Sequence, residues 1–223
     1  MRVFLLHGMA RTVVSMAVLA HRLERAGHRP NLFGYHVLLQ PLDEIAARFR
    51  DRVRRVVTGD GPGATFAIVG HSLGGVVARM ASPQLPPGLA RLVLLASPAR
   101  PPATALALEA NPLFRRLARD AGRRLRDPAF FEALPRPQVP TLVIAGTRGP
   151  TSPRLPYAGA PNDGIVRVSE TTIEGAEQLR VHGVHTFLMN RKDVFEAIQE
   201  FLTSPQESLC PDSPHAQEGG EDP

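Results

Sequence analysis

A serine between glycines is the residue in this chain most suited to nucleophilic chemistry. Residues 70–75 read Gly-His-Ser-Leu-Gly-Gly, which places Ser72 at the centre of a Gly-x-Ser-x-Gly element. An apolar run, residues 66–69, precedes the element, and a run with helical spacing, residues 76–80, follows it. A strand that turns sharply into a helix exposes such a serine hydroxyl at the tip of the turn. We therefore predict that Ser72 is a nucleophile; the competing interpretation is a glycine-rich turn with an incidental serine.

A serine hydroxyl is a weak nucleophile, so this hypothesis requires a general base and an acid. Asp163 follows an apolar strand predicted over residues 141–145, and His185 follows a short strand-like segment, residues 178–181. Both side chains then lie on loops that leave the carboxyl ends of strands, the edge at which open parallel sheets bind ligands. We predict that His185 takes the proton of Ser72 and that Asp163 orients the imidazole.

Other residues could take these two roles. His182 is the rival of His185 as the base, but it lies nearer the end of the predicted strand, and we favour His185. Glu170 and Glu174 are rivals of Asp163 as the acid. Asp163 is favoured because the glycine that follows it suits a sharp turn.

The start of the chain offers a site for an oxyanion. The apolar run of residues 2–6 leads directly into His7-Gly8. Where a serine stands on a strand–turn–helix element, the loop after an early strand supplies one backbone donor, and the amide after the nucleophile supplies the other. We therefore predict that the backbone N–H groups of Met9 and Leu73 form an oxyanion hole. Met9 is assigned by position, since its side chain matters little to this role.

Taken in this order, the segments resemble the α/β-hydrolase superfamily, in particular its small bacterial lipases and esterases. The resemblance rests on His7-Gly8, on residues 70–75, on Asn-Asp-Gly-Ile-Val at 162–166 and on His185, and it spans about residues 2–203. It implies a serine hydrolase that cleaves carboxylic esters through an acyl-enzyme and needs no cofactor. A thioesterase or an acyltransferase would use the same three residues. A catalytically silent binding protein with the same fold is a third alternative.

Strands and helices alternate along the chain. This pattern predicts an α/β protein with a mostly parallel sheet of about six strands. We assign residues 1–203 to one α/β-hydrolase domain, in which residues 97–137 form a short helical lid that shapes an apolar acyl pocket. An ordinary crossover helix is the alternative for that insertion. Residues 204–223 are polar and contain several prolines and glycines, which predicts a disordered tail.

Composition and charge narrow the possible partners. The 223 residues include 26 Lys and Arg against 21 Asp and Glu, a formal net charge of +5. Arginines gather over residues 115–126 without an accompanying aromatic or glycine pattern, so we expect a solvated helical face there and no nucleic-acid partner. Contact with an anionic membrane surface is a weaker alternative. The partner we expect is a small ester or lipid-like acyl substrate.

Cysteine usage and apolar runs bear on metals and location. The single cysteine, Cys210, excludes an internal disulfide, and no His/Cys cluster has the spacing of metal ligands, so we expect no metal. The apolar run at the start is short and is needed as a strand, and no run approaches the roughly 18 apolar residues of a membrane span. We therefore expect a cytoplasmic protein.

Overall fold

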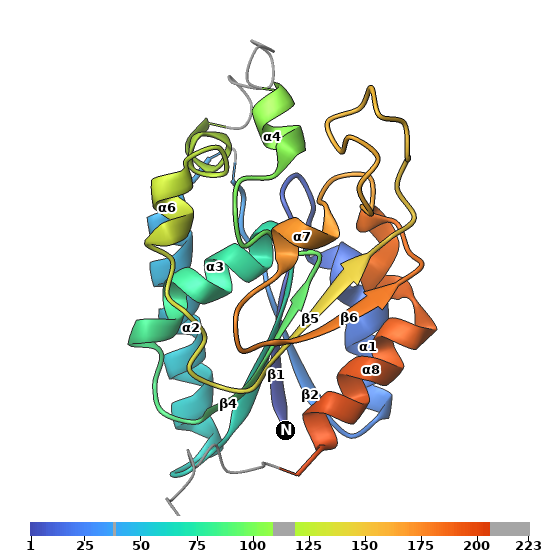
Figure 1. Ribbon diagram of the computed structural model, residues 1–223. Coiled ribbons are helices and arrows are strands. Elements are labelled where there is room, and N and C mark those ends of the chain that lie inside the picture. The colour runs from blue at the N-terminus through green and yellow to red at the C-terminus, as the bar shows by residue number, and fades with distance from the viewer. Residues whose placement is uncertain (38, 109–118, 206–223) are drawn as a thin grey trace, which may run out of the picture.

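Six parallel strands form one sheet at the centre of the molecule (Figure 1). The computed structural model describes residues 1–37, 39–108 and 119–205. The strand order is β2-β1-β3-β4-β5-β6, and every neighbouring pair is parallel, which confirms the predicted α/β class. The strands are β1 (Arg2–Leu6), β2 (Arg29–Phe33), β3 (Phe66–His71), β4 (Leu89–Leu95), β5 (Thr141–Gly146) and β6 (Glu177–Val181).

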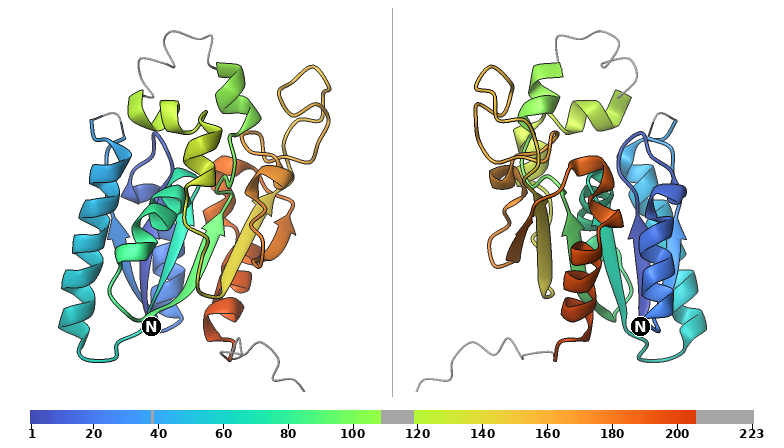
Figure 2. Two further views of the ribbon diagram at one scale, coloured as in Figure 1. Left: turned by 60° about the vertical axis from the view of Figure 1, so that its left-hand side comes forward. Right: turned by 90° about the vertical axis from the view of Figure 1, so that its right-hand side faces the viewer.

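Helices cover both faces of this sheet (Figures 1 and 2). Helices α2 and α3 pack on one face, and α1 and α8 pack on the other. The α-helices are α1 (Ala17–Arg25), α2 (Leu42–Asp60), α3 (Leu73–Ala81), α4 (Ala103–Ala107), α6 (Pro128–Glu132), α7 (Val168–Thr171) and α8 (Lys192–Thr203). Short 3-10 helices are η1 (Val13–Met16), η2 (Ser82–Gln84) and η4 (His185–Asn190). Residues 119–124 are also helical.

The apolar strands are continuous runs because both faces of the sheet are buried. Successive side chains of a strand point to opposite faces. In β1, Val3 and Leu5 therefore join the core beneath α1 and α8, whereas Phe4 and Leu6 join the core beneath α2 and α3. Phe4 meets Phe49 of α2 edge to face, with 5.9 Å between the ring centroids. The two cores hold the sheet rigid from both sides.

The carboxyl ends of the strands meet at one edge, and the insertion between β4 and β5 lies above it. Figure 2 shows α4 and α6 over this edge. Residues 109–118 of the expected lid, and residues 206–223 of the expected tail, lie outside the described residues, as does Cys210. Within the described ranges, no helix has both the length and the apolar character that a bilayer crossing requires.

Candidate active site

Ser72 stands at the tip of the turn between β3 and α3, in a strained backbone conformation, and glycines on either side are packed closely against the neighbouring backbone. Its backbone has φ 54° and ψ −123°. A Cβ added at Gly70 would lie 2.5 Å from the Cα of Gly75, and one added at Gly74 would lie 2.5 Å from the carbonyl oxygen of Leu6. The glycines let α3 start directly against β1 and β3, so the serine hydroxyl projects from the turn.

A chain of hydrogen bonds joins Ser72, His185 and Asp163. The Nε2 atom of His185 lies 2.9 Å from the Oγ atom of Ser72, and its Nδ1 atom lies 2.8 Å from Oδ2 of Asp163. Asp163 is 2% exposed and His185 is 8% exposed. A carboxylate only accepts, so Nδ1–H donates to Asp163 and Nε2 is left to accept the serine proton. The structure therefore brings the three predicted residues together.

The turn after Asp163 holds its carboxylate in place. The other carboxylate oxygen, Oδ1, accepts hydrogen bonds from the N–H groups of Ile165 at 2.9 Å and Val166 at 2.8 Å. Gly164 has φ +98°, a conformation that side chains other than glycine adopt with strain. These two backbone N–H groups fix Oδ1 in the turn, so Oδ2 is left facing His185.

Asn162 organises this turn, a role that the sequence analysis did not assign. Its Oδ1 accepts from the N–H of Gly164 at 2.9 Å, and its Nδ2 donates to the carbonyl oxygens of Pro150 and Ala160, each at 2.9 Å. Asn162 is 1% exposed. The signal was present in the sequence, since Asn before Asp-Gly is typical of a turn closed by the asparagine side chain.

His71 anchors the loop that carries His185. It is buried, and its Nε2–H donates to the backbone carbonyl oxygen of His185 at 3.0 Å. Burial lowers the pKa of His71 well below its ordinary value, and the neighbouring imidazole of His185 lowers it further. His71 is therefore neutral at pH 7, which keeps a second positive charge away from the His185 ring.

The loop after β1 lies against Ser72 and is held by a stacked pair of rings. The His7 ring stacks on Tyr35 with 4.2 Å between centroids, and its Nδ1–H donates to the Gly8 carbonyl oxygen at 2.9 Å. The Tyr35 hydroxyl donates to the carbonyl oxygen of His7. A Cβ added at Gly8 would lie 3.1 Å from the Cβ of Ser72. The predicted oxyanion residue Met9 therefore follows a residue in contact with the serine.

A cavity of about 280 Å³ opens beside Ser72. Both predicted oxyanion residues, Met9 and Leu73, line it together with His185. The insertion supplies much of the remaining wall, through Pro98, Pro102, Thr104, Ala105, Leu108 and Leu125. These side chains are mostly apolar, and they place the described parts of the insertion over the serine. That the insertion acts as a lid stays a prediction.

The rival acids and base lie elsewhere. His182 is exposed to solvent. The carboxylate of Glu170 accepts from the backbone N–H groups of Ala103 at 2.9 Å and Arg167 at 2.8 Å, so it connects α7 to the start of α4. Glu174 is exposed and forms an ion pair with an arginine. Neither glutamate contacts His185, which leaves Asp163 as its partner.

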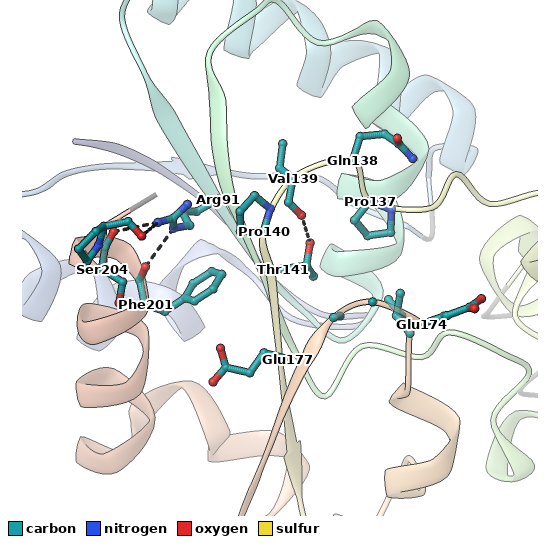
Figure 3. Close-up of a pocket in the computed structure, with 14 residues that line it drawn as sticks. Arg91, Pro137, Gln138, Val139, Pro140, Thr141, Glu174, Glu177, Phe201 and Ser204 are labelled. Carbon is teal, nitrogen blue, oxygen red and sulfur yellow. Dashed lines mark hydrogen bonds between the residues drawn. The ribbon is translucent and has the colours of Figure 1, made fainter. Parts of the chain in front are cut away.

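A larger hollow of about 710 Å³ lies at the opposite, amino-terminal edge of the sheet (Figure 3). Its one arginine, Arg91, donates to the carbonyl oxygens of Phe201, Ser204 and Pro205 at the end of α8. The guanidinium also stands over the Phe201 ring, 5.4 Å from its centroid. Arg91 thus satisfies the terminal carbonyls of a helix, and the residues predicted to carry chemistry lie at the other edge.

Metal ligands do not gather in the described part of the chain. Within residues 1–37, 39–108 and 119–205, no three His, Cys, Asp or Glu side chains are placed so that they could hold a metal ion.

Comparisons with solved structures show that other proteins share this fold. A mature lipase from Bacillus licheniformis superposes with a TM-score of 0.73 at 16% identity, over 90% of this chain and 91% of that one. An esterase from Exiguobacterium antarcticum superposes with a TM-score of 0.64 at 17% identity, over 91% of this chain and 92% of that one. At such identities the likeness shows the fold alone. A search of curated proteins found no match.

The model of one protein family matches nearly the whole described chain. The match covers residues 3–205 and extends from β1, without its first residue, to the end of α8. This chain is therefore a member of the alpha/beta hydrolase family.

Proposed function

We propose that this protein is a serine hydrolase that cleaves carboxylic esters through an acyl-enzyme. The observation that carries the proposal is the hydrogen-bonded chain from Asp163 through His185 to Ser72 at the wall of a largely apolar cavity. A nucleophile, a base and a group that orients the base are the minimum set for covalent acyl transfer. The proposal is also supported by membership of the alpha/beta hydrolase family and by the fold that the chain shares with a lipase and an esterase.

In the first half of the reaction, Oγ of Ser72 attacks the carbonyl carbon of the ester. The new C–O bond forms as His185 Nε2 takes the hydroxyl proton, and the electron pair of the C=O bond moves to oxygen. Asp163 stabilises the imidazolium without taking its proton. The N–H groups of Met9 and Leu73 are proposed to donate to the resulting oxyanion, where fixed donors stabilise developing charge more than they stabilise the neutral ester.

In the second half, the oxyanion reforms the C=O bond and the bond to the leaving alcohol breaks. His185 donates its proton to the alcohol oxygen, which leaves the acyl group on Ser72. Water then attacks the acyl carbon while His185 takes a proton from it. Collapse of the second oxyanion breaks the bond between the acyl carbon and Oγ of Ser72, and His185 returns its proton to Oγ as the carboxylic acid leaves. Atoms and charge balance without a cofactor.

The cavity wall indicates the class of acyl group. Pro98, Ala105, Leu108 and Leu125 present apolar surface, which favours a hydrocarbon chain over a sugar or a peptide. A thioester would follow the same steps with sulfur as the leaving atom, and an acyltransferase would replace water by another acceptor. Substrate comparison separates these three reactions.

The test is hydrolysis of p-nitrophenyl esters from acetyl to palmitoyl by the wild type and by Ser72→Ala. We expect the substitution to lower kcat by roughly a thousandfold or more, because nucleophile removal leaves only binding and oxyanion contacts. Labelling of the wild type by a fluorophosphonate, with no labelling of Ser72→Ala, gives an independent readout. A folded wild type that neither hydrolyses any ester faster than Ser72→Ala nor reacts with the probe would favour a binding protein.

A further inference from the structure

Arg11 is a cationic side chain at the proposed active site, and the ester hydrolysis described above gives it no role. Among the described residues that line the cavity beside Ser72, Arg11 is the only one with a permanent charge. It follows Met9 by two positions, on the loop that leaves β1. Arg11 is half-buried in a mostly apolar wall, so the buried part of its guanidinium group has lost water that a partner must replace.

The structure gives Arg11 only part of that compensation. Its Nη2 donates to the backbone carbonyl oxygen of Thr186 at 3.0 Å. Its Nε is buried and has no hydrogen-bond partner. Among the described residues no carboxylate forms an ion pair with it. Among the described residues, one carbonyl oxygen therefore accepts from a group that has five N–H donors, and the remaining donors apart from Nε–H face the cavity or solvent.

Two other arginines in the fold show what a structural role looks like. Arg91 donates to three carbonyl oxygens at the end of α8. Arg79, buried in α3, donates to the carbonyl oxygens of Leu134 and Pro135, although its Nη1 is also buried without a partner. Both side chains hold elements together, and both lie away from the cavity beside Ser72. Arg11 makes fewer such bonds and lines the cavity itself.

Arg11 lies close in sequence to a proposed oxyanion donor and is hydrogen-bonded to the residue that follows the proposed base. Its loop carries Met9, a proposed oxyanion donor, and the carbonyl that it binds belongs to Thr186, the residue after His185. Arg11 also lines a second cavity of about 380 Å³, beside Tyr35 and Val37. A negatively charged group bound by Arg11 would thus stand at the border of the two cavities, within reach of a small ester whose carbonyl lies at Ser72.

We propose that Arg11 binds an anionic oxygen group of the substrate, so that the preferred esters carry a carboxylate or a phosphate close to the scissile bond. The planar guanidinium matches either group with two parallel N–H donors, and the apolar surroundings strengthen the interaction. This inference rests on the proposed ester hydrolysis and adds a substrate class to it. The charged group is on the acyl arm or on the alcohol arm of the ester, and the two are tested separately.

The test compares kcat/KM within matched pairs of esters at low salt. For the acyl arm, mono-p-nitrophenyl glutarate is compared with p-nitrophenyl pentanoate. For the alcohol arm, the butyrate ester of glycerol 3-phosphate is compared with glycerol monobutyrate. Each ratio of anionic to neutral ester is measured for the wild type, Arg11→Gln and Arg11→Lys. The glutamine keeps a donor for the Thr186 carbonyl, and the lysine keeps the charge.

We expect one arm to show a preference for the anionic ester that Arg11→Gln lowers by about tenfold or more, as removal of a charge-assisted hydrogen bond does. Arg11→Lys should lose less than Arg11→Gln. The matched control is Arg100→Gln, which removes the same charge from an exposed position outside the cavity wall and should leave the ratio unchanged.

Two results would overturn the inference. One is a wild type that hydrolyses the neutral esters but prefers the anionic member in neither arm. The other is an Arg11→Gln variant that slows both members of each pair equally, which would assign Arg11 to holding the Thr186 loop alone. Both results leave ester hydrolysis standing. A wild type that turns over no ester in either pair would instead contradict the proposed function, and the inference with it.

Discussion

Ser72 has a backbone conformation that amino acids with a side chain rarely adopt, with φ 54° and ψ −123°. Such strain costs about 1–3 kcal/mol, and glycine avoids it at an entropic cost of about 0.5–1 kcal/mol. Ser72→Ala and Ser72→Gly both remove the hydroxyl, but only the glycine variant also removes the strain. We predict that Ser72→Gly has the higher free energy of unfolding, by about 1 kcal/mol, as measured by urea denaturation. An alanine variant of equal or greater stability would contradict this account.

Asp163 combines two functions that a single substitution can separate. Its Oδ1 accepts two backbone N–H groups of its own turn, and its Oδ2 accepts the Nδ1–H of His185. In Asp163→Asn the amide oxygen can keep the turn, but the amide nitrogen would donate to His185 and leave the proton on Nε2. That nitrogen could then no longer accept the proton of Ser72. We predict a fall in kcat of roughly a thousandfold to ten-thousandfold with little change in stability.

The control for this prediction is Asp163→Ala, which also leaves the N–H groups of Ile165 and Val166 without their acceptor. That variant should lose both activity and stability, because unsatisfied buried donors are costly. The pair is assayed for ester hydrolysis and for unfolding in urea. If Asp163→Asn kept kcat within about tenfold of the wild type, the proposed role of the carboxylate would be wrong.

At the scale of elements, the start of α3 depends on how closely it approaches β1. A Cβ at Gly74 would lie 2.5 Å from the carbonyl oxygen of Leu6, a backbone atom that cannot move without moving the strand. We predict that Gly74→Ala lowers the free energy of unfolding by about 1–3 kcal/mol or more, as overpacking does. Urea denaturation measures the loss.

The matched control is Gly59→Ala, which makes the same change inside α2. No atom lies within 4 Å of a Cβ added at Gly59. Alanine is a better helix former than glycine by about 0.8–1 kcal/mol, so this variant should be more stable than the wild type. If both substitutions shifted stability in the same direction, close approach would not explain the glycine at position 74.

Local sequence patterns predict the strands and the three main site residues, but they do not predict which distant segments contact one another. The central strands were predictable because a parallel sheet buried on both faces leaves continuous apolar runs. Ser72 and Asp163 follow such runs, whereas His185 follows the more polar edge strand β6, and all three meet at one sheet edge. Pairings between distant segments leave no local pattern. Glu170 was an open rival for the acid until its carboxylate was seen to accept the N–H of Ala103, 67 residues away.

The same limit applies to the side chains that hold the site loops. The bond from His71 to the His185 carbonyl spans 114 residues, and the His7–Tyr35 stack spans 28. Each histidine lies within a recognisable motif, but neither motif shows which distant segment the histidine contacts. Similarly, a role for Arg11 in substrate binding could be proposed only after the structure had shown that it lines the cavity beside Ser72.

For the molecule as a whole, three buried histidines connect stability to pH. His7, His28 and His71 are each 8% exposed or less, and burial is the main cause that lowers the pKa of each below the ordinary value of 6.5. Below that pH the unfolded chain binds protons that the folded chain excludes. Stability is therefore fully present above about pH 6.5 and falls as the pH drops, by up to about 1.4 kcal/mol per pH unit for each histidine.

The pH dependence of the stability of His28→Gln tests whether buried histidines cause the loss of stability at low pH. His28 is suited to this test because it lies away from the proposed active site. Its Nε2 is 2.9 Å from Oε1 of Gln199, and glutamine can donate to the same oxygen. The free energy of unfolding is measured in urea from about pH 8 to pH 5, which stays above the ordinary pKa values of Asp and Glu. We predict a shallower slope below about pH 6.5 for the variant than for the wild type. Parallel profiles would show that burial of His28 is not coupled to protonation, because a glutamine binds no proton in either state.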